Sequence, residues 1–111
     1  MSNGFDFVID CTDTEGQEFD YKGFMQDFKI AEHFGKAAIF DTWKRAMNEW
    51  RDNVEYFASF VLTLNHLMWN HYHENQIAIS HYYEELWRKA DQFAYGHFKG
   101  DDLSYYIRFL D

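Results

Sequence analysis

From residue 24 onwards, apolar residues recur at helical spacing and no proline interrupts them. Proline is the strongest helix breaker, because it lacks the backbone N–H and its ring clashes with the preceding turn. The 111-residue chain contains none at all, which favours a mainly helical structure. Residues three, four or seven apart lie on one face of a helix, so this spacing predicts amphipathic helices that share a core.

The apolar spacing divides this part of the chain into predicted helices at about 24–35, 36–50, 53–73 and 77–97, with a last short helix after KGDD at 99–102. Apolar residues in the third range cover more than one face, so we expect that helix to be central. The expected core faces are Phe24, Phe28, Ala31 and Phe34; Phe40, Trp43, Met47 and Trp50; Val54, Phe57, Val61, Leu64 and Met68; Ile79, Tyr83, Leu86, Ala90 and Phe93; and Leu103, Tyr106, Ile107 and Leu110.

Two of the helix boundaries carry recognisable capping residues. Asp52, followed three residues later by Glu55, is typical of the N-terminus of a helix. Gly100 is a plausible C-terminal cap for the fourth helix, with Asp101 or Asp102 capping the last one. The break at 51–53 contains neither glycine nor proline, so a continuous or kinked helix remains an alternative there.

The first residues have a different period. In FDFVIDC (5–11) and EFDYK (18–22), apolar residues alternate with others, which is typical of strands, and TDTEG (12–16) between them resembles a turn. We therefore predict a β-hairpin over about 4–22 whose apolar face packs on the helices. The predicted fold class is α+β, mainly α: a single domain (1–111) with a hairpin subregion (1–23) and a bundle of about four to five helices (24–111).

The net charge of −9 is concentrated near the N-terminus. Residues 1–35 carry eight acidic and two basic side chains, whereas residues 36–73 carry four of each sign. Binding to phosphates requires Lys and Arg, so we expect no direct nucleic-acid binding and an attraction to basic surfaces instead. Solubility alone is the simpler explanation for an acidic protein. Aromatic residues make up 22% of the chain, and we expect some to be exposed for contact with a partner.

The composition also predicts a location. Cys11 is the single cysteine, so no intrachain disulfide forms, and a reducing compartment is expected. The N-terminal residues lack the pattern of a signal peptide, and no apolar run is long enough for a membrane span. We expect a cytoplasmic protein of a bacterial host cell with no membrane partner.

LNHLMWNHYHENQ (64–76) gathers three histidines with several rings, which suggests a metal site or a catalytic base. A metal site needs ligands that converge on one point. His66 and His71 differ by about 140° around a helix, and His71 and His73 by about 200°. His66 and His73 share a face but stand about 10 Å apart along it. We therefore predict no metal site and interpret His66 and His71 as residues at the core edge that satisfy polar groups.

Motifs for catalysis are absent from the sequence. GxSxG, GxGxxG and GK[ST] do not occur, and Cys11 lies among acids that disfavour its thiolate. We predict that the protein is not an enzyme, with no catalytic residue and no cofactor. An enzyme that uses the histidines at 66–73 remains the least favoured alternative.

Several segments together resemble a group of small acidic proteins carried by phages, plasmids and integrative conjugative elements of Gram-positive bacteria. These segments are DFKIAEHFG (27–35), DTWKRAMNEW (41–50), LTLNHLMW (62–69), YEELWRKAD (83–91) and KGDDLSYYIRFLD (99–111). The resemblance implies a counter-defence context, of anti-CRISPR or antirestriction type. It carries over no residue roles, because the group has no functional motif.

The expected function is inhibition of a host defence nuclease by binding alone. The expected partner is a basic nucleic-acid-binding protein, most simply a type II CRISPR effector nuclease, which reads DNA through arginines. Acids of the predicted hairpin would stand in for phosphates, as in a DNA mimic, with an aromatic side chain as anchor. The alternative is an accessory or regulatory protein of the mobile element that acts as a homodimer. The predicted partner-binding residues are Asp10, Asp13, Glu15, Glu18, Asp20 and Tyr21.

Overall fold

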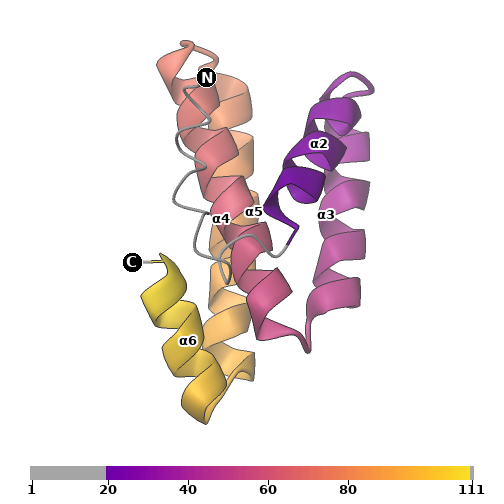
Figure 1. Cartoon of the computed structure of the whole chain (residues 1–111). Helices are drawn as coiled ribbons and strands as arrows, with labels where there is room; N and C mark the ends of the chain where they lie inside the picture. Colours follow the sequence, from indigo (N-terminus) through magenta and orange to yellow (C-terminus); the bar gives the residue numbers. More distant parts are fainter. Residues whose placement is uncertain (1–19, 111) are drawn as a thin grey trace.

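The computed structural model describes residues 20–110, which form five helices joined by short turns (Figure 1). The order along the chain is α2 (Tyr21–Glu32), α3 (Lys36–Trp50), α4 (Val54–His73), α5 (Ile77–His97) and α6 (Gly100–Leu110). Figure 1 shows the α2–α3 pair on one side of α4 and α6 on the other. The predicted helical bundle is therefore confirmed for this part of the chain.

Helix α4 lies at the centre of the bundle and contacts α2, α3, α5 and α6. Its position follows from its sequence, because apolar residues occupy most of its circumference and most of them pack against neighbouring helices. Ten of its 20 residues are buried, among them Phe57, Phe60 and Leu64, which are completely so. The prediction of a central third helix is confirmed.

The core is built largely from rings. Phe57 has its ring centroid within 5.5–5.6 Å of those of Phe60, Phe93 and Phe98, and 6.5 Å from that of Tyr106. These five residues come from α4, α5, the turn after α5, and α6. A ring in such offset or edge contacts buries a large apolar area, so Phe57 links three parts of the bundle at one point.

The predicted α+β fold class is wrong for the described residues, which are all helical and contain no strand. Tyr21 and Lys22, placed by the alternating pattern in the second strand, open helix α2 instead. The alternation in EFDYK is only five residues long, and Tyr21 also begins the helical spacing that continues through Phe24 and Phe28. That longer pattern prevails because it buries the rings of Tyr21, Phe24 and Phe28 against α4. The rest of the predicted hairpin, residues 4–19, lies outside the described residues.

The chain breaks between α3 and α4, so the alternative of one continuous helix is wrong. The capping residue is Asn53 rather than the predicted Asp52, since the Asn53 side-chain oxygen accepts a 3.1 Å hydrogen bond from the Tyr56 backbone N–H. Asp52 instead lies 2.9 Å from His97 Nε2 at the end of α5. Asp and Asn are equally good capping residues, so only the backbone conformation distinguishes them.

Two predicted core residues lie on the surface. Phe34 is 77% exposed because α2 ends at Glu32, and the turn before α3 carries Phe34 away from the face that buries Phe28. Phe40 is 36% exposed and stacks on the outside of Trp43, while Ile39 takes its place in the core. For Phe34 the predicted helix is too long, whereas for Phe40 the core-facing residue is the one before it.

In the described part of the chain, no helix combines the length and the apolar character that crossing a membrane requires.

Candidate functional site

Two of the six predicted partner-binding residues are described. Asp20 is exposed and precedes α2 with a left-handed φ of 69°, a conformation that Asp adopts more readily than most residues. Tyr21 is buried, with 6% of its surface exposed, and its hydroxyl lies 2.6 Å from His66 Nδ1. Tyr21 therefore holds α2 against α4. Asp10, Asp13, Glu15 and Glu18 lie outside the described residues.

His66 is a partly buried residue on the edge of α4. Its Nδ1 is paired with the Tyr21 hydroxyl, and the two rings meet edge to face. Burial lowers the pKa of His66, because the charged imidazolium is poorly solvated there. His66 is thus a neutral ring that satisfies a polar group at the core edge, as the spacing predicts.

His71 occupies the centre of a buried polar network between three helices. Its Nε2 lies 2.9 Å from Glu32 Oε2, and the Tyr83 hydroxyl donates a 2.7 Å hydrogen bond to the same oxygen. His71 Nδ1 faces the Gln76 side-chain amide, and its ring stacks on that of Tyr83. Burial, followed by the hydrogen bond and the charge of Glu32, raises the pKa of Tyr83. The network ties the C-terminal ends of α2 and α4 to α5, and both ring nitrogens of His71 are engaged in it.

His73 belongs to an exposed group of rings that we call the ring cluster, formed by Trp69, Tyr72 and His73 at the C-terminal end of α4. Trp69 and Tyr72 are 48% and 50% exposed, and their centroids lie 5.7 Å apart at 88°. His73 stacks on Trp69 with centroids 6.0 Å apart. Three rings that contact one another rather than the core form a compact amphipathic surface of the kind enriched at protein interfaces.

Ile30 and Phe34 are a second exposed apolar pair, 51% and 77% exposed, where α2 turns into α3. They border a shallow hollow between these helices that also contains Asp27, Asp41 and Arg45. The pair lies on the α2–α3 side of the bundle, whereas the ring cluster lies at the end of α4. The ring cluster and the Ile30–Phe34 pair are thus two distinct groups of exposed apolar residues.

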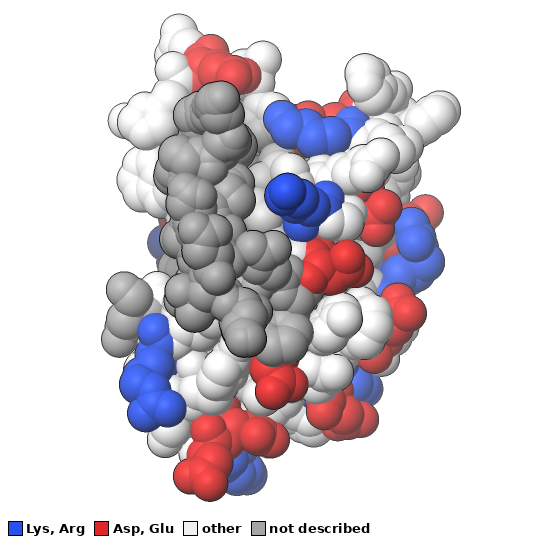
Figure 2. All heavy atoms as spheres, viewed as in Figure 1, with Lys and Arg blue, Asp and Glu red and all other residues white. Residues whose placement is uncertain are grey.

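Charge is distributed evenly over the helical body. Residues 20–110 carry 13 acidic and ten basic side chains, so six of the nine net negative charges belong to residues 1–19 and 111. On the face in Figure 2, Lys and Arg lie among Asp and Glu over the visible helices. A body of mixed charge does not by itself imitate the continuous anionic surface of DNA.

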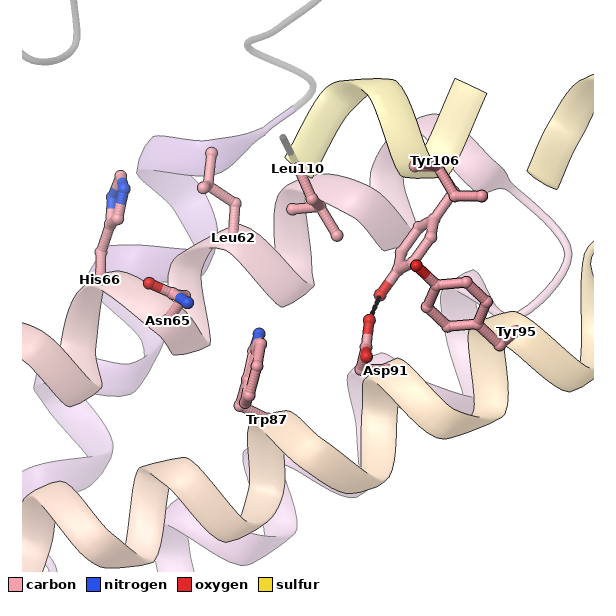
Figure 3. A pocket seen from close by; sticks show the side chains of 9 residues that line it. Leu62, Asn65, His66, Trp87, Asp91, Tyr95, Tyr106 and Leu110 are labelled. Carbon is pink, nitrogen blue, oxygen red and sulfur yellow. Dashed lines mark hydrogen bonds between the residues drawn. The ribbon is translucent and has the colours of Figure 1, made fainter. Parts of the chain in front are cut away.

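A pocket of about 410 Å³ opens between α4, α5 and α6 (Figure 3). In its wall, the Tyr106 hydroxyl donates a 2.7 Å hydrogen bond to Asp91 Oδ1, and the Tyr95 ring meets the Tyr106 ring edge to face. Burial, the hydrogen bond and the charge of Asp91 together raise the pKa of Tyr106. Its lining residues are Leu62, Asn65, His66, Trp87, Asp91, Tyr95, Tyr106, Ile107 and Leu110.

Among the described residues, no group of three or more His, Cys, Asp or Glu side chains converges on one point as a metal ion requires. The three histidines of 64–76 point to separate neighbours: His66 to Tyr21, His71 to Glu32, and His73 to Trp69. The sequence spacing predicts that these histidines point in different directions around α4, and their contacts agree with that prediction.

Comparisons of the chain with models of known families, with curated proteins and with solved structures find no match. The resemblance to small acidic proteins of mobile elements therefore stays a prediction. The features that bear on function are the acidic N-terminal residues, the ring cluster, the exposed Ile30–Phe34 pair and the α4–α5–α6 pocket.

The sequence reasoning missed the ring cluster, although the signal was present. Trp69 is one of the apolar residues by which the range 53–73 covers more than one face, and this pattern predicts a place in the core. However, Trp69, Tyr72 and His73 are spaced three and four apart and so share one face of the helix. That face turns away from the neighbouring helices. The Glu32–His71–Tyr83 network left no signal in the sequence, because its three members are 39 and 12 residues apart along the chain.

Proposed function

We propose that this protein is a binding protein without catalytic activity, and that it inhibits a nuclease by occupying a basic surface on it. The ring cluster is the observation that carries this proposal. Trp69 and Tyr72 expose about half of their surface, contact each other, and contribute little to the core. Large exposed rings that are held in place by their neighbours lose little entropy on binding and are typical anchors of an interface.

The charge of the chain supports a basic partner. The net charge is −9, and Asp10, Asp13, Glu15, Glu18 and Asp20 precede the first described helix. Acids increase the rate of association with a basic surface, and the rings provide cation–π contacts with its Lys and Arg side chains. Channels of nucleases that bind DNA or RNA are rich in these side chains. Within that class, the sequence resemblance favours an RNA-guided defence nuclease, in bacterial cytoplasm.

The test is binding to a purified type II CRISPR nuclease, measured by calorimetry at low and at high salt. We expect tight binding that weakens as salt is added, because exposed charges are screened. Replacing both Trp69 and Tyr72 with Ala is expected to weaken binding at least tenfold, and Phe34→Ala, which removes an exposed ring outside the ring cluster, serves as the control. Equal binding by the ring-cluster variant and the control would rule out the ring cluster as the anchor.

The contribution of the acids needs a variant of its own. Reversing Asp13, Glu15 and Glu18 to Lys is expected to reduce both the affinity and its dependence on salt. If this variant inhibits the nuclease as well as the natural protein does, the phosphate-mimic part of the proposal is wrong. If the natural protein shows no affinity for the nuclease at low salt, the choice of target class is wrong.

The second candidate is an accessory protein of a mobile element that acts as a homodimer. The exposed Ile30–Phe34 pair favours it, since Phe34 has 77% of its surface in solvent and would gain from burial against a second copy. Sedimentation distinguishes the two: a dimer in the natural protein that Phe34→Ala converts to a monomer supports this candidate, and a monomer at all concentrations excludes it.

A further inference from the structure

The carboxylate of Asp91 is the starting point, because it is a partly buried charge that has no counterion among residues 20–110. Its Oδ1 accepts the Tyr106 hydroxyl, and the Asp91 carboxylate has no ion pair with any described residue. A carboxylate that is partly removed from water is normally compensated by a cation or by several donors. One hydroxyl is an incomplete compensation, and Asp91 is one of the residues that line the pocket (Figure 3).

The walls of the pocket favour a positively charged ligand. Of the nine described residues that line it, only Asp91 and His66 are of types that can carry a charge near neutral pH. Burial lowers the pKa of His66 and so keeps it neutral, which removes the one group that would repel a cation. Trp87 and Tyr95 line the pocket together with Asp91 and come from the same helix, and the faces of such rings attract cations.

The pocket also has room for an apolar body and polar groups to orient it. Its volume of about 410 Å³ lies within the roughly 300–1,000 Å³ that small-molecule sites occupy. Leu62, Ile107 and Leu110 form the apolar part of the wall. The side chains of Asn65 and Trp87 make no hydrogen bond to any described residue, and Figure 3 shows both extending into the open space. The Trp87 indole N–H and the Asn65 amide N–H can donate hydrogen bonds to a ligand, and the Asn65 carbonyl oxygen can accept one.

The geometry points to a binding site for an organic cation, an ammonium group on an apolar or aromatic body, between α4, α5 and α6. The ammonium group pairs with Asp91 among the rings of Tyr95 and Trp87, and the body lies against Leu62 and Leu110. This site is separate from the ring cluster, so it goes beyond the proposed function and does not depend on it.

A set of three ligands with the same body and different charge tests the proposal. The probes are 2-phenylethylamine, 2-phenylethanol and 3-phenylpropionate, each titrated into the ¹⁵N-labelled full chain and followed by the Trp87 indole N–H resonance. We expect the amine to shift this resonance in a saturable way and to bind at least tenfold more tightly than the alcohol, and the carboxylate not to bind. Equal affinities for all three, or no saturable shift with the amine, would overturn the proposal.

Asp91→Asn is the matching variant, because its side-chain oxygen can still accept the Tyr106 hydroxyl while the charge is lost. We expect it to weaken amine binding at least tenfold. Glu85→Gln removes the same charge from an exposed position of α5 outside the pocket, and is expected to leave amine binding unchanged. Unchanged binding in Asp91→Asn would show that the carboxylate is not the partner of the amine. If Asp91→Asn does not fold, the comparison of the three ligands on the natural protein still shows whether the pocket selects a positive charge.

The ammonium group could belong to a free small molecule or to a lysine side chain of a protein partner. A parallel titration with Nα-acetyl-lysinamide distinguishes these sources. Tighter binding of 2-phenylethylamine assigns the site to small aromatic amines, and tighter binding of the lysine derivative assigns it to a lysine side chain. If neither amine binds, there is no ammonium site in this pocket.

Discussion

Two tyrosines, Tyr83 and Tyr106, illustrate how single residues join the helices of this protein. Each is almost completely buried, and each hydroxyl donates a 2.7 Å hydrogen bond to a carboxylate, of Glu32 and of Asp91 respectively. A hydrogen bond to a charged acceptor contributes more than one between neutral groups, about 1.5–3 kcal/mol. These contacts connect α5 with α2 and α6 with α5, and they make the hydroxyl, as well as the ring, part of the fold.

The raised pKa of these two phenols predicts a loss of stability in alkali. In the unfolded chain a tyrosine ionises near its ordinary pKa of about 10, whereas the folded protein keeps both protons. Above that pH the unfolded state binds fewer protons, so the free energy of unfolding falls by about 1.4 kcal/mol per pH unit for each tyrosine. Urea denaturation at about pH 9 and about pH 11 measures the loss.

The double variant Tyr83→Phe/Tyr106→Phe isolates this effect. We expect it to be less stable than the natural protein at neutral pH and to lose less stability between about pH 9 and about pH 11. Tyr72→Phe, an exposed tyrosine of the ring cluster, is the control and should follow the natural protein. An identical alkaline loss in the double variant and the natural protein would contradict the assignment.

At the scale of the elements, backbone conformation rather than residue type decides which residue caps the N-terminus of α4. The break before α4 contains Asp52 and Asn53 in succession, and both residue types are good N-caps. Asn53 has the extended backbone that an N-cap requires, with φ −121° and ψ 97°, and its side chain accepts the Tyr56 N–H. Asp52 lies one residue before the cap position. Its side chain is 80% exposed and contacts His97 instead.

Alanine substitution distinguishes these two neighbours. Asn53→Ala is expected to lower the free energy of unfolding by about 0.5–2 kcal/mol, because the first turn of α4 loses its cap. Asp52→Ala removes only an exposed contact with His97 and should cost less than about 1 kcal/mol. Chemical denaturation of both variants under the same conditions measures the difference. If Asp52→Ala lowers the free energy of unfolding more than Asn53→Ala does, the cap is Asp52, as the sequence pattern predicts.

At the scale of the whole molecule, the bundle is organised around one helix and one ring. Helix α4 contacts every other described helix, and Phe57 on it contacts rings from α5, the following turn and α6. Because α6 joins the bundle mainly through α4, its attachment depends on this ring group. The two surfaces and the pocket that bear on function lie around this common core rather than within it.

Phe57→Ala and Phe34→Ala compare the centre of the molecule with its surface. Deleting a fully buried Phe leaves a cavity and typically costs about 3–5 kcal/mol, a large part of the roughly 5–15 kcal/mol that keeps a domain folded. Phe34→Ala is expected to change stability by less than about 0.5 kcal/mol, since its ring is mostly in solvent. Thermal and urea denaturation test both, and similar losses in the two variants would contradict the burial assigned to Phe34.

Much of the helical architecture could be predicted from the sequence. The expected ranges 36–50 and 77–97 coincide with α3 and α5, and the expected central helix is α4. Helix position is a local property, because apolar residues at a spacing of three and four must share a face wherever the helix packs. The scatter of His66, His71 and His73 around α4 follows from the same geometry.

Only the tertiary structure decided which of these residues meet. Glu32, His71 and Tyr83 come together because the ends of three helices converge, and residues so far apart along the chain leave no periodic signal. How the helices cross and end likewise decides the exposure of Trp69 and Phe34, the choice of Asn53 as cap, and the position of the Asp91 carboxylate at the α4–α5–α6 pocket. Sequence spacing determined the helices of this protein; the free energy of packing them determined its surfaces and its candidate sites.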